Sequence, residues 1–303
     1  MVKSTRVYLP LVLLVIFFAS CGAPDKELTP TEVSFDSERL LAFSEGSLPG
    51  SEPESFGRSW FQGGFHSAPI FSPDGNSVWW AGSYATQKVY VSHYLNGEWT
   101  EQEEVSFSDD IASYRDPFIS PDGMKFYFVS TAQIPGQDGR NKENYWMMEW
   151  ESGAWSEPQP LPDSINDLQI HWTPSVASNY DFYFAANIDG NPDIYKAEFK
   201  DGTYGEPAPL GFSISTDELE FTPHIAPDQS YLLFSRAKDN NSPVYLYISY
   251  AIDGGWIEPV RVENVNNCIS PIVTPDGNYV IYLDGPSALK WRDTSFIEEL
   301  RPE

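Results

Sequence analysis

The sequence predicts an all-β protein, folded as a single β-propeller of five four-stranded blades. Three observations carry this prediction: a turn motif that recurs five times, an apolar run after each copy, and a composition rich in aromatic residues, proline and glycine. The 303 residues include 10 Trp, 17 Tyr, 19 Phe, 25 Pro and 21 Gly. This mixture favours short strands joined by tight turns over a helical bundle.

The recurring motif ends in Ser-Pro-Asp-Gly in its clearest copies and returns roughly every 50 residues. Its five copies, two of them degenerate, are 68–75, 116–123, 173–179, 222–229 and 270–277. Within the motif, Pro suits the first position of a turn, and Gly takes the left-handed backbone conformation that starts the returning strand. Each copy therefore predicts a β-hairpin.

Each turn is followed by a short run of apolar residues without polar alternation. These runs are 78–80, 126–128, 182–184, 232–234 and 280–282. A strand without alternation is buried on both faces, as it would be in radial sheets that pack against a neighbour on each side. A third strand follows in each unit, at 89–91, 145–147, 194–196, 244–246 and 289–291. Four units then carry a Gly-containing turn, at Gly97, Gly153, Gly202 and Gly254, that leads into an outer fourth strand.

The fifth unit ends without its fourth strand, while residues 54–61 form an orphan strand ahead of the first unit. We expect this N-terminal strand to pair with the last blade, which closes the ring and removes exposed sheet edges. The alternative is a sixth, degenerate repeat at residues 34–43, which would give a six-bladed propeller.

The N-terminus has the layout of an export signal. Lys3 and Arg6 precede an apolar run at 7–19 that is too short to span a bilayer. The run ends in Phe-Ala-Ser-Cys21, which resembles the bacterial lipobox. The resemblance implies cleavage before Cys21 and attachment of diacylglycerol to its sulfur; the alternative is an ordinary secretory signal with a chance Cys.

This interpretation divides the chain into three parts: a lipoprotein signal peptide at 1–20, an acidic, proline-containing tether at 21–53, and the propeller at 54–303. Within the tether, a short amphipathic element is expected at 37–43. The polar residues after Cys21 favour delivery to the outer membrane, on its periplasmic side or at the cell surface. With Cys21 lipidated, only Cys268 remains, so no intramolecular disulfide is expected.

Residues 54–303 resemble the WD40-like, Pro-Asp-type repeats of TolB-like propellers and of many bacterial lipoproteins, on the strength of the Ser-Pro-Asp-Gly copies. The resemblance implies an envelope propeller that often serves as a scaffold for other proteins. TolB carries a further N-terminal domain that this sequence does not match, so the partners of TolB are not transferred.

Functional residues of a propeller are expected on the loops that ring its central channel. The positions just before the leading prolines of the turn motifs share one end of that channel by repeat register, so their polar and aromatic residues predict a ligand-binding rim. The predicted rim comprises Tyr114, Arg115, Asp116, His171, Trp172 and Glu220, together with His224, which lies just inside the following strand. Polar residues that merely anchor loops are the alternative interpretation.

The net charge of −26 argues against nucleic-acid binding. The sequence favours a non-enzymatic envelope lipoprotein that binds a protein or a glycan. The alternative is a carbohydrate-active enzyme with Asp116 and Glu220 as the catalytic carboxylates. No cofactor and no metal site is predicted; the alternating oxygen ligands at 189–193 suggest calcium only weakly, since a plain turn explains them.

Overall fold

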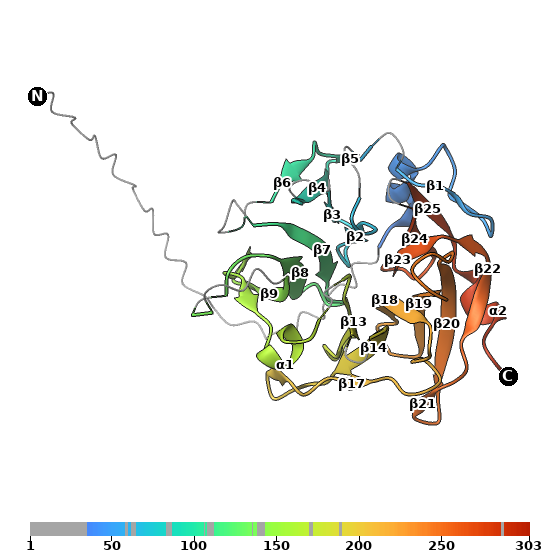
Figure 1. Ribbon diagram of the computed structural model, residues 1–303. Coiled ribbons are helices and arrows are strands. Elements are labelled where there is room, and N and C mark those ends of the chain that lie inside the picture. The colour runs from blue at the N-terminus through green and yellow to red at the C-terminus, as the bar shows by residue number, and fades with distance from the viewer. Residues whose placement is uncertain are drawn as a thin grey trace, which may run out of the picture. The chain divides into compact units, whose positions relative to one another are not determined.

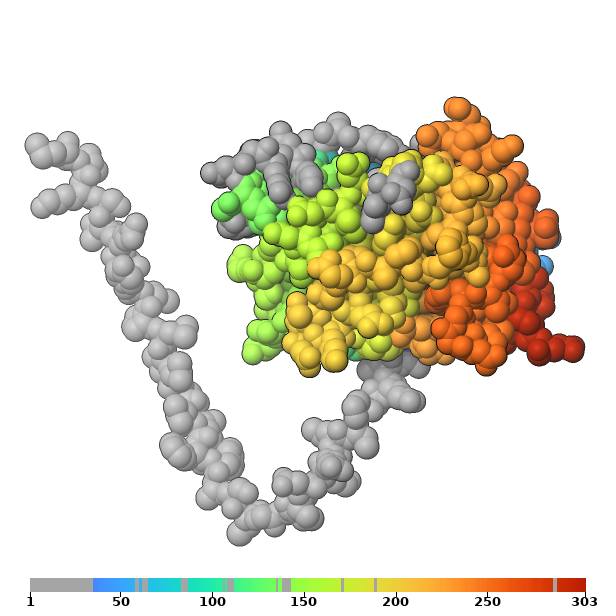
Figure 2. All heavy atoms as spheres, turned by 60° about the horizontal axis from the view of Figure 1, so that its bottom comes forward, coloured from blue at the N-terminus to red at the C-terminus, as the bar shows by residue number. Residues whose placement is uncertain are grey.

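The computed structural model describes residues 35–57, 60–61, 65–82, 87–105, 107, 112–134, 136–137, 143–169, 172–187, 190–285 and 288–303. Within residues 35–303, five antiparallel sheets follow one another around a ring, which confirms the predicted five-bladed β-propeller (Figure 1). Successive blades lie side by side in chain order, as the colour sequence from green to red also shows in the space-filling view (Figure 2).

The strands are assigned to the blades as follows. Blade one contains β2 (Ile70–Phe71), β3 (Ser77–Ala81), β4 (Val89–Leu95), β5 (Glu98–Trp99) and β6 (Glu103–Glu104). Blade two contains β7 (Tyr114–Ile119), β8 (Lys125–Ser130), β9 (Asn144–Glu151), β10 (Ala154–Trp155) and β11 (Gln159–Pro160). Blade three contains β12 (Ser175–Val176), β13 (Phe182–Asn187), β14 (Pro192–Ala197) and β17 (Ala208–Pro209), with a small hairpin of β15 (Phe199–Lys200) and β16 (Thr203–Tyr204).

Blade four contains β18 (Leu219–Ile225), β19 (Tyr231–Ala237), β20 (Tyr245–Ile252), β21 (Gly255–Trp256) and β22 (Val260–Asn266). Blade five contains β23 (Cys268–Val273), β24 (Tyr279–Asp284), β25 (Leu289–Asp293) and β1 (Glu54–Ser55). Three short helices accompany the blades: η1 (Ser37–Phe43), α1 (Asp163–Asn166) and α2 (Ser295–Glu299). In blades one, two and four the third strand pairs twice, with the hairpin strand at its tip and with the returning outer strand.

The Ser-Pro-Asp-Gly turns form as predicted. In blade one, Gly75 has a φ of +66°, and the Ser72 hydroxyl donates to Asp74 Oδ1 at 2.6 Å. Blade two repeats this geometry, with Gly123 at +74° and a 2.6 Å bond from the Ser120 hydroxyl to Asp122. The serine and the aspartate thus hold the turn while glycine supplies the backbone conformation that side chains disfavour.

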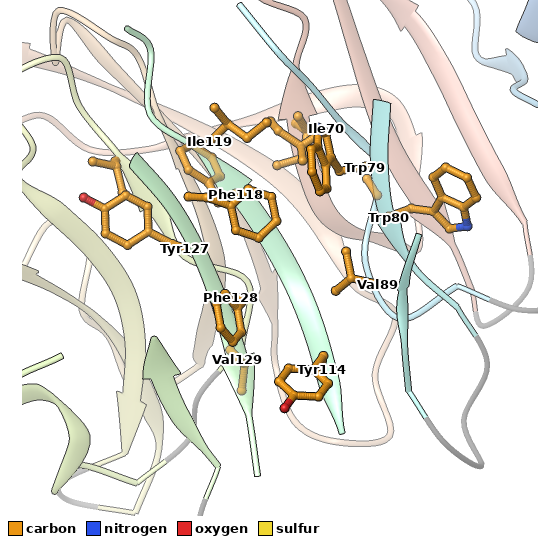
Figure 3. Close-up of a cluster of buried hydrophobic side chains, with 14 of the residues drawn as sticks. Ile70, Trp79, Trp80, Val89, Tyr114, Phe118, Ile119, Tyr127, Phe128 and Val129 are labelled. Atoms are coloured by element: carbon orange, nitrogen blue, oxygen red, sulfur yellow. The ribbon is translucent and has the colours of Figure 1, made fainter. Parts of the chain in front are cut away.

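The apolar runs after the turns are buried on both faces. All six residues of β8 and all five of β3 are buried. Figure 3 shows the interface that they form between blades one and two, where Trp79 and Ile119 lie at one end and Phe128 and Tyr114 at the other. Radial packing of neighbouring blades is the reason that these strands lack polar alternation.

The ring closes through the N-terminal strand, as predicted. β1 pairs antiparallel with β25, in the register Glu54↔Trp291, and the Phe56 amide donates to the Leu289 carbonyl at 3.0 Å. The ring of Phe56 lies 5.0 Å from that of Trp291 and is 1% exposed. The first described strand of the chain therefore completes the last blade and covers its edge.

The packed part of the chain begins earlier than the predicted boundary at residue 54. Residues 37–43 form the short helix η1, in which Leu40 and Phe43 are buried in the same core as blade one. Phe43 stacks against Phe56 at 5.3 Å. Residues 37–43, where a short amphipathic element was expected within the tether of 21–53, thus pack in the core, and the alternative sixth blade at 34–43 is wrong because most of this segment is helical.

The predicted signal peptide and Cys21 lie outside the described residues. Across the described ranges, no helix has both the length and the apolar character needed to cross a bilayer. Cys268 is a buried free thiol on β23, and burial raises its pKa well above the usual range.

Candidate functional site

The innermost strands of blades two, four and five each contain a β-bulge at the leading proline of the repeat. The register shifts lie between Arg115 and Phe118, between Phe221 and His224, and between Ile269 and Ile272. The residues just before these prolines have left-handed backbone conformations: φ is +51° at Asp116, +45° at Thr222 and +52° at Ser270. Proline is tolerated at a bulge because it has no amide hydrogen to contribute to the ladder, and a bulge redirects a side chain.

The redirected side chains meet in one hydrogen-bond network that includes all five blades. Asp116 Oδ1 accepts from His66 Nδ1 at 2.9 Å and from the Thr173 hydroxyl at 3.3 Å. The hydroxyls of Thr173 and Ser270 lie 2.8 Å apart, and the Ser270 amide donates to Thr222 Oγ1 at 3.1 Å. Because blades three and five are not neighbours, the bond between Thr173 and Ser270 crosses the centre of the ring.

Asp116 is the charged centre of this network. Its side chain is 0% exposed, and its Oδ2 atom is buried without a hydrogen-bond partner. Arg115 Nε lies 3.9 Å from that oxygen, while the Arg115 guanidinium also pairs with Glu143 and donates to Gln87 Oε1 at 3.2 Å. Burial lowers the pKa of Arg115, an effect that the charge of Asp116 opposes. The carboxylate is thus compensated from inside the protein.

Two other predicted rim residues belong to the hydrophobic packing. Tyr114 is 3% exposed, and its ring stacks on Phe107 at a centroid distance of 4.3 Å. Trp172 is partly buried, with its ring edge-on to Phe221 at 5.4 Å and its carbonyl oxygen accepting from the Tyr145 hydroxyl at 2.8 Å. His171 lies outside the described residues.

Glu220 lies in a separate cluster between blades three and four. Its carboxylate is 0% exposed, 2.9 Å from Arg236 Nε, and accepts bonds from the amide and hydroxyl of Thr216. Burial raises the pKa of Glu220, and a hydrogen bond with Asp193 acts in the same direction.

His224 is 6% exposed, and its Nδ1 atom is buried without a hydrogen-bond partner. Its register partner on β19 is Leu233, which packs in the cluster between blades four and five. Burial lowers the pKa of His224 to about 4, so this imidazole is neutral at physiological pH. The structure therefore brings Arg115 and Asp116 together, and places Tyr114, Trp172, Glu220 and His224 in separate surroundings.

A surface groove that the sequence analysis missed lies between blades one and two, at the end of the blades that carries the Ser-Pro-Asp-Gly turns. It has a volume of about 440 Å³. We call it the turn groove; its lining is made of Ser72, Pro73, Asp74, Asn76, Ser77, Trp79, His93, Ile119, Asp122, Gly123, Met124, Trp150 and Trp155. Trp150 is 39% exposed and pairs across the β9–β10 hairpin with Trp155. The sequence does contain a signal for this groove, because Trp150 and Trp155 flank one hairpin turn and lie beyond the apolar run at 126–128.

We find no cluster of three or more His, Cys, Asp and Glu side chains that could hold a metal ion within the described ranges. Asp189, the first residue of the weak calcium pattern, lies outside them. Within that pattern, the Asn191 side-chain amide donates at 3.0 Å to the carbonyl of Asp217, which lies just before β18 of the next blade.

No known protein-family model matches the sequence. No curated protein matches it either. Among solved structures, a TolB protein of Agrobacterium tumefaciens is 16% identical, with a TM-score of 0.51, over 71% of this chain and 68% of that one. Hydrazine synthase of Kuenenia stuttgartiensis is 12% identical, with a TM-score of 0.50, over 77% of this chain and 38% of that one.

TolB of Acinetobacter baumannii is also 16% identical, with a TM-score of 0.47 over 74% of this chain. The chain spans about half the length of that protein, 53% of it. At these identities the likeness concerns the fold, which proteins of different function share. The chain is a five-bladed β-propeller similar in fold to TolB-like proteins.

Proposed function

We propose that this protein is an envelope lipoprotein, anchored through Cys21, whose propeller binds a ligand without converting it. Its ligand is a protein or a glycan of the envelope. The observation that carries the binding role is the turn groove, where Trp150 is 39% exposed beside two carboxylates. Exposed tryptophan next to directional polar groups is typical of binding sites.

The surroundings of Asp116 and Glu220 favour binding over glycoside hydrolysis. A glycosidase needs two carboxyl groups that face one glycosidic bond, about 5–9.5 Å apart. Both of these side chains are 0% exposed, and each is held by its own internal partners. A substrate would have to displace those partners before it reached either carboxylate.

The test of the binding role uses the full-length protein in detergent. A glycan array and fractionated envelope proteins are screened for retention, and soluble products are followed for reducing sugar. We expect a retained ligand with no release of sugar, and retention that is lost in Trp150→Ala but kept in Asp116→Asn. Sugar release that disappears in Asp116→Asn or Glu220→Gln would instead establish the hydrolase.

The anchor is tested separately, by fractionation of cells that express Cys21→Ser. The thiol is required for diacylglycerol attachment, and acyl chains are what hold such a protein at the bilayer. We expect the variant to leave the membrane fraction or to keep its signal peptide, with a corresponding change in mass. Unchanged fractionation and mass would contradict the anchor.

A further inference from the structure

The turn groove has an aromatic wall with a fixed orientation. Trp150 on β9 and Trp155 on β10 are register partners, and their rings meet edge-on at 5.2 Å with an interplanar angle of 72°. Trp155 is fixed in turn by Phe126, at 5.6 Å. Because the hairpin holds both rings, the exposed surface of Trp150 is presented without a large entropic cost on binding.

Two aspartates line the same groove, from equivalent turns of neighbouring blades. Asp74 accepts from the Ser72 hydroxyl and from the Asn76 amide at 3.0 Å, and Asp122 accepts from the Ser120 hydroxyl and from the Met124 amide at 3.0 Å. Partial burial raises the pKa of both groups, but these hydrogen bonds outweigh it and leave both pKa values below their usual range. Both side chains are therefore ionised at neutral pH.

The carboxylate of Asp74 keeps unused acceptor capacity. An ionised carboxylate offers about four lone-pair sites. The Oδ2 atom of Asp74 accepts from the Asn76 side-chain amide at 2.8 Å, and Oδ2 of Asp122 accepts from the Tyr180 hydroxyl. With the two bonds at its Oδ1, three sites of Asp74 are used, so one remains for a ligand donor, whereas Asp122 also accepts from its own backbone amide and contributes its negative charge.

The charge of the turn groove favours a cation. The lining residues include neither Lys nor Arg. Arg39 borders the blade-one turn: its guanidinium donates to the Asp74 carbonyl at 3.0 Å, stacks over Tyr94 at 4.8 Å, and helps to lower the pKa of the Asp74 carboxyl. The guanidinium of Arg39 thus contacts both a carbonyl oxygen of a turn and an aromatic ring. A neutral ligand that covered both carboxylates would remove their hydration without replacing it by opposite charge.

From these observations we infer that the turn groove binds an arginine side chain carried on an extended segment of a partner protein. The inference rests on the proposed binding function and specifies its ligand. A guanidinium is planar, so it can stack on Trp150 while its N–H groups reach Asp74 and its charge lies near Asp122. An ammonium group lacks the flat face, and a sugar ring lacks the charge.

The test measures fluorescence anisotropy of a labelled Gly-Arg-Gly-Arg-Gly peptide with the full-length protein in detergent. Matched peptides carry citrulline, which keeps the shape of arginine without its charge, or lysine. We expect the arginine peptide to bind most tightly, and affinity to fall as salt is added. Trp150→Ala should weaken binding by about fivefold or more, as expected for the loss of a cation–π contact. Trp150→Phe should retain part of the affinity.

Phe212→Ala is the matched control, because Phe212 is 100% exposed and lies on blade three, away from the groove. Phe212→Ala should bind the peptide like the wild type, and the melting temperatures of Phe212→Ala and Trp150→Ala should both equal that of the wild type. Equal binding by wild type and Trp150→Ala would reveal general attraction to the net charge of −26 and would overturn the inference. Equal binding of the citrulline or lysine peptide would also overturn it.

Maltohexaose is added as a neutral competitor to separate this inference from the proposed function. A saccharide that binds in a Trp150-dependent way, where the arginine peptide does not, overturns the arginine assignment and leaves the binding function in place. Failure of the binding function itself would be recognised by release of reducing sugar in the array experiment.

Discussion

Thr173 of blade three and Ser270 of blade five share a hydrogen bond of 2.8 Å between their hydroxyl groups, although their blades are not neighbours in the ring. Each residue directly precedes the leading proline of its repeat. Through Asp116 and Thr222, the same network reaches the other blades. At this level the centre of the propeller is occupied by protein side chains, so a ligand site is expected on the blade surfaces rather than in the channel.

The network gives a first prediction. His66→Ala removes the closest hydrogen-bond donor to Asp116, a fully buried carboxylate. We expect the variant to lose about 2–3 kcal/mol of unfolding free energy, as for a lost hydrogen bond to a buried charged group. Urea denaturation measures the loss. His93→Ala is the control, since His93 is partly exposed and borders the groove, and its effect should stay within about 0.5 kcal/mol.

The helix η1 gives a second prediction, with two adjacent leucines as a matched pair. Leu40 is 0% exposed, whereas Leu41 is 42% exposed. Leu40→Ala should cost about 2–5 kcal/mol because it leaves a cavity in the core, while Leu41→Ala should change stability by about 0.5 kcal/mol or less. Thermal melts of both variants test this. Similar melting temperatures would mean that η1 does not belong to the cooperative unit.

Closure of the ring gives a third prediction. Phe56 follows the closing strand and lies between Phe43 and Trp291, at centroid distances of 5.3 and 5.0 Å. Phe56→Ala should destabilise the protein by about 3–5 kcal/mol and should promote aggregation through the uncovered edge of β25. Light scattering during thermal unfolding reports both effects. The exposed neighbour Glu54 serves as the comparison, and Glu54→Ala should melt like the wild type.

The buried imidazole of His224 gives a fourth prediction, on pH. Its pKa is about 4 in the folded protein, below the value of about 6.5 expected after unfolding. Between these values the unfolded chain binds the additional proton, so stability is complete above pH 6.5 and falls as the pH drops towards 4. The loss approaches about 3 kcal/mol.

Urea denaturation of wild type and His224→Gln, from pH 7 to pH 4, checks this. The variant should start less stable at pH 7, because a polar amide replaces a packed imidazole, but it should lose less stability on acidification. Parallel pH profiles for the two proteins would show that the acid sensitivity comes from other groups.

The candidate site could be predicted only in part. Register predicted Asp116 on a rim at one end of the channel, because repeat equivalence fixes height along the channel; in the structure its side chain is fully buried among residues of other blades. It did not predict that Tyr114 would stack on Phe107, because stacking depends on a loop between blades that follows no repeat. The turn groove was missed because its walls come from two blades, and a single repeat contains only half of it.

The sequence by itself determined the number of blades, the turns and the closing strand. Each of these depends on local chemistry that repeats: Pro and Gly set turn backbones, unalternated apolar runs set two-sided burial, and an unpaired edge requires a partner. Only the tertiary structure decided that Asp116 is enclosed by His66 and Thr173, and that Trp150 stays open to solvent. The physical reason is that hydrogen bonding and exposure at these positions are set by side chains from other blades, far away in the sequence.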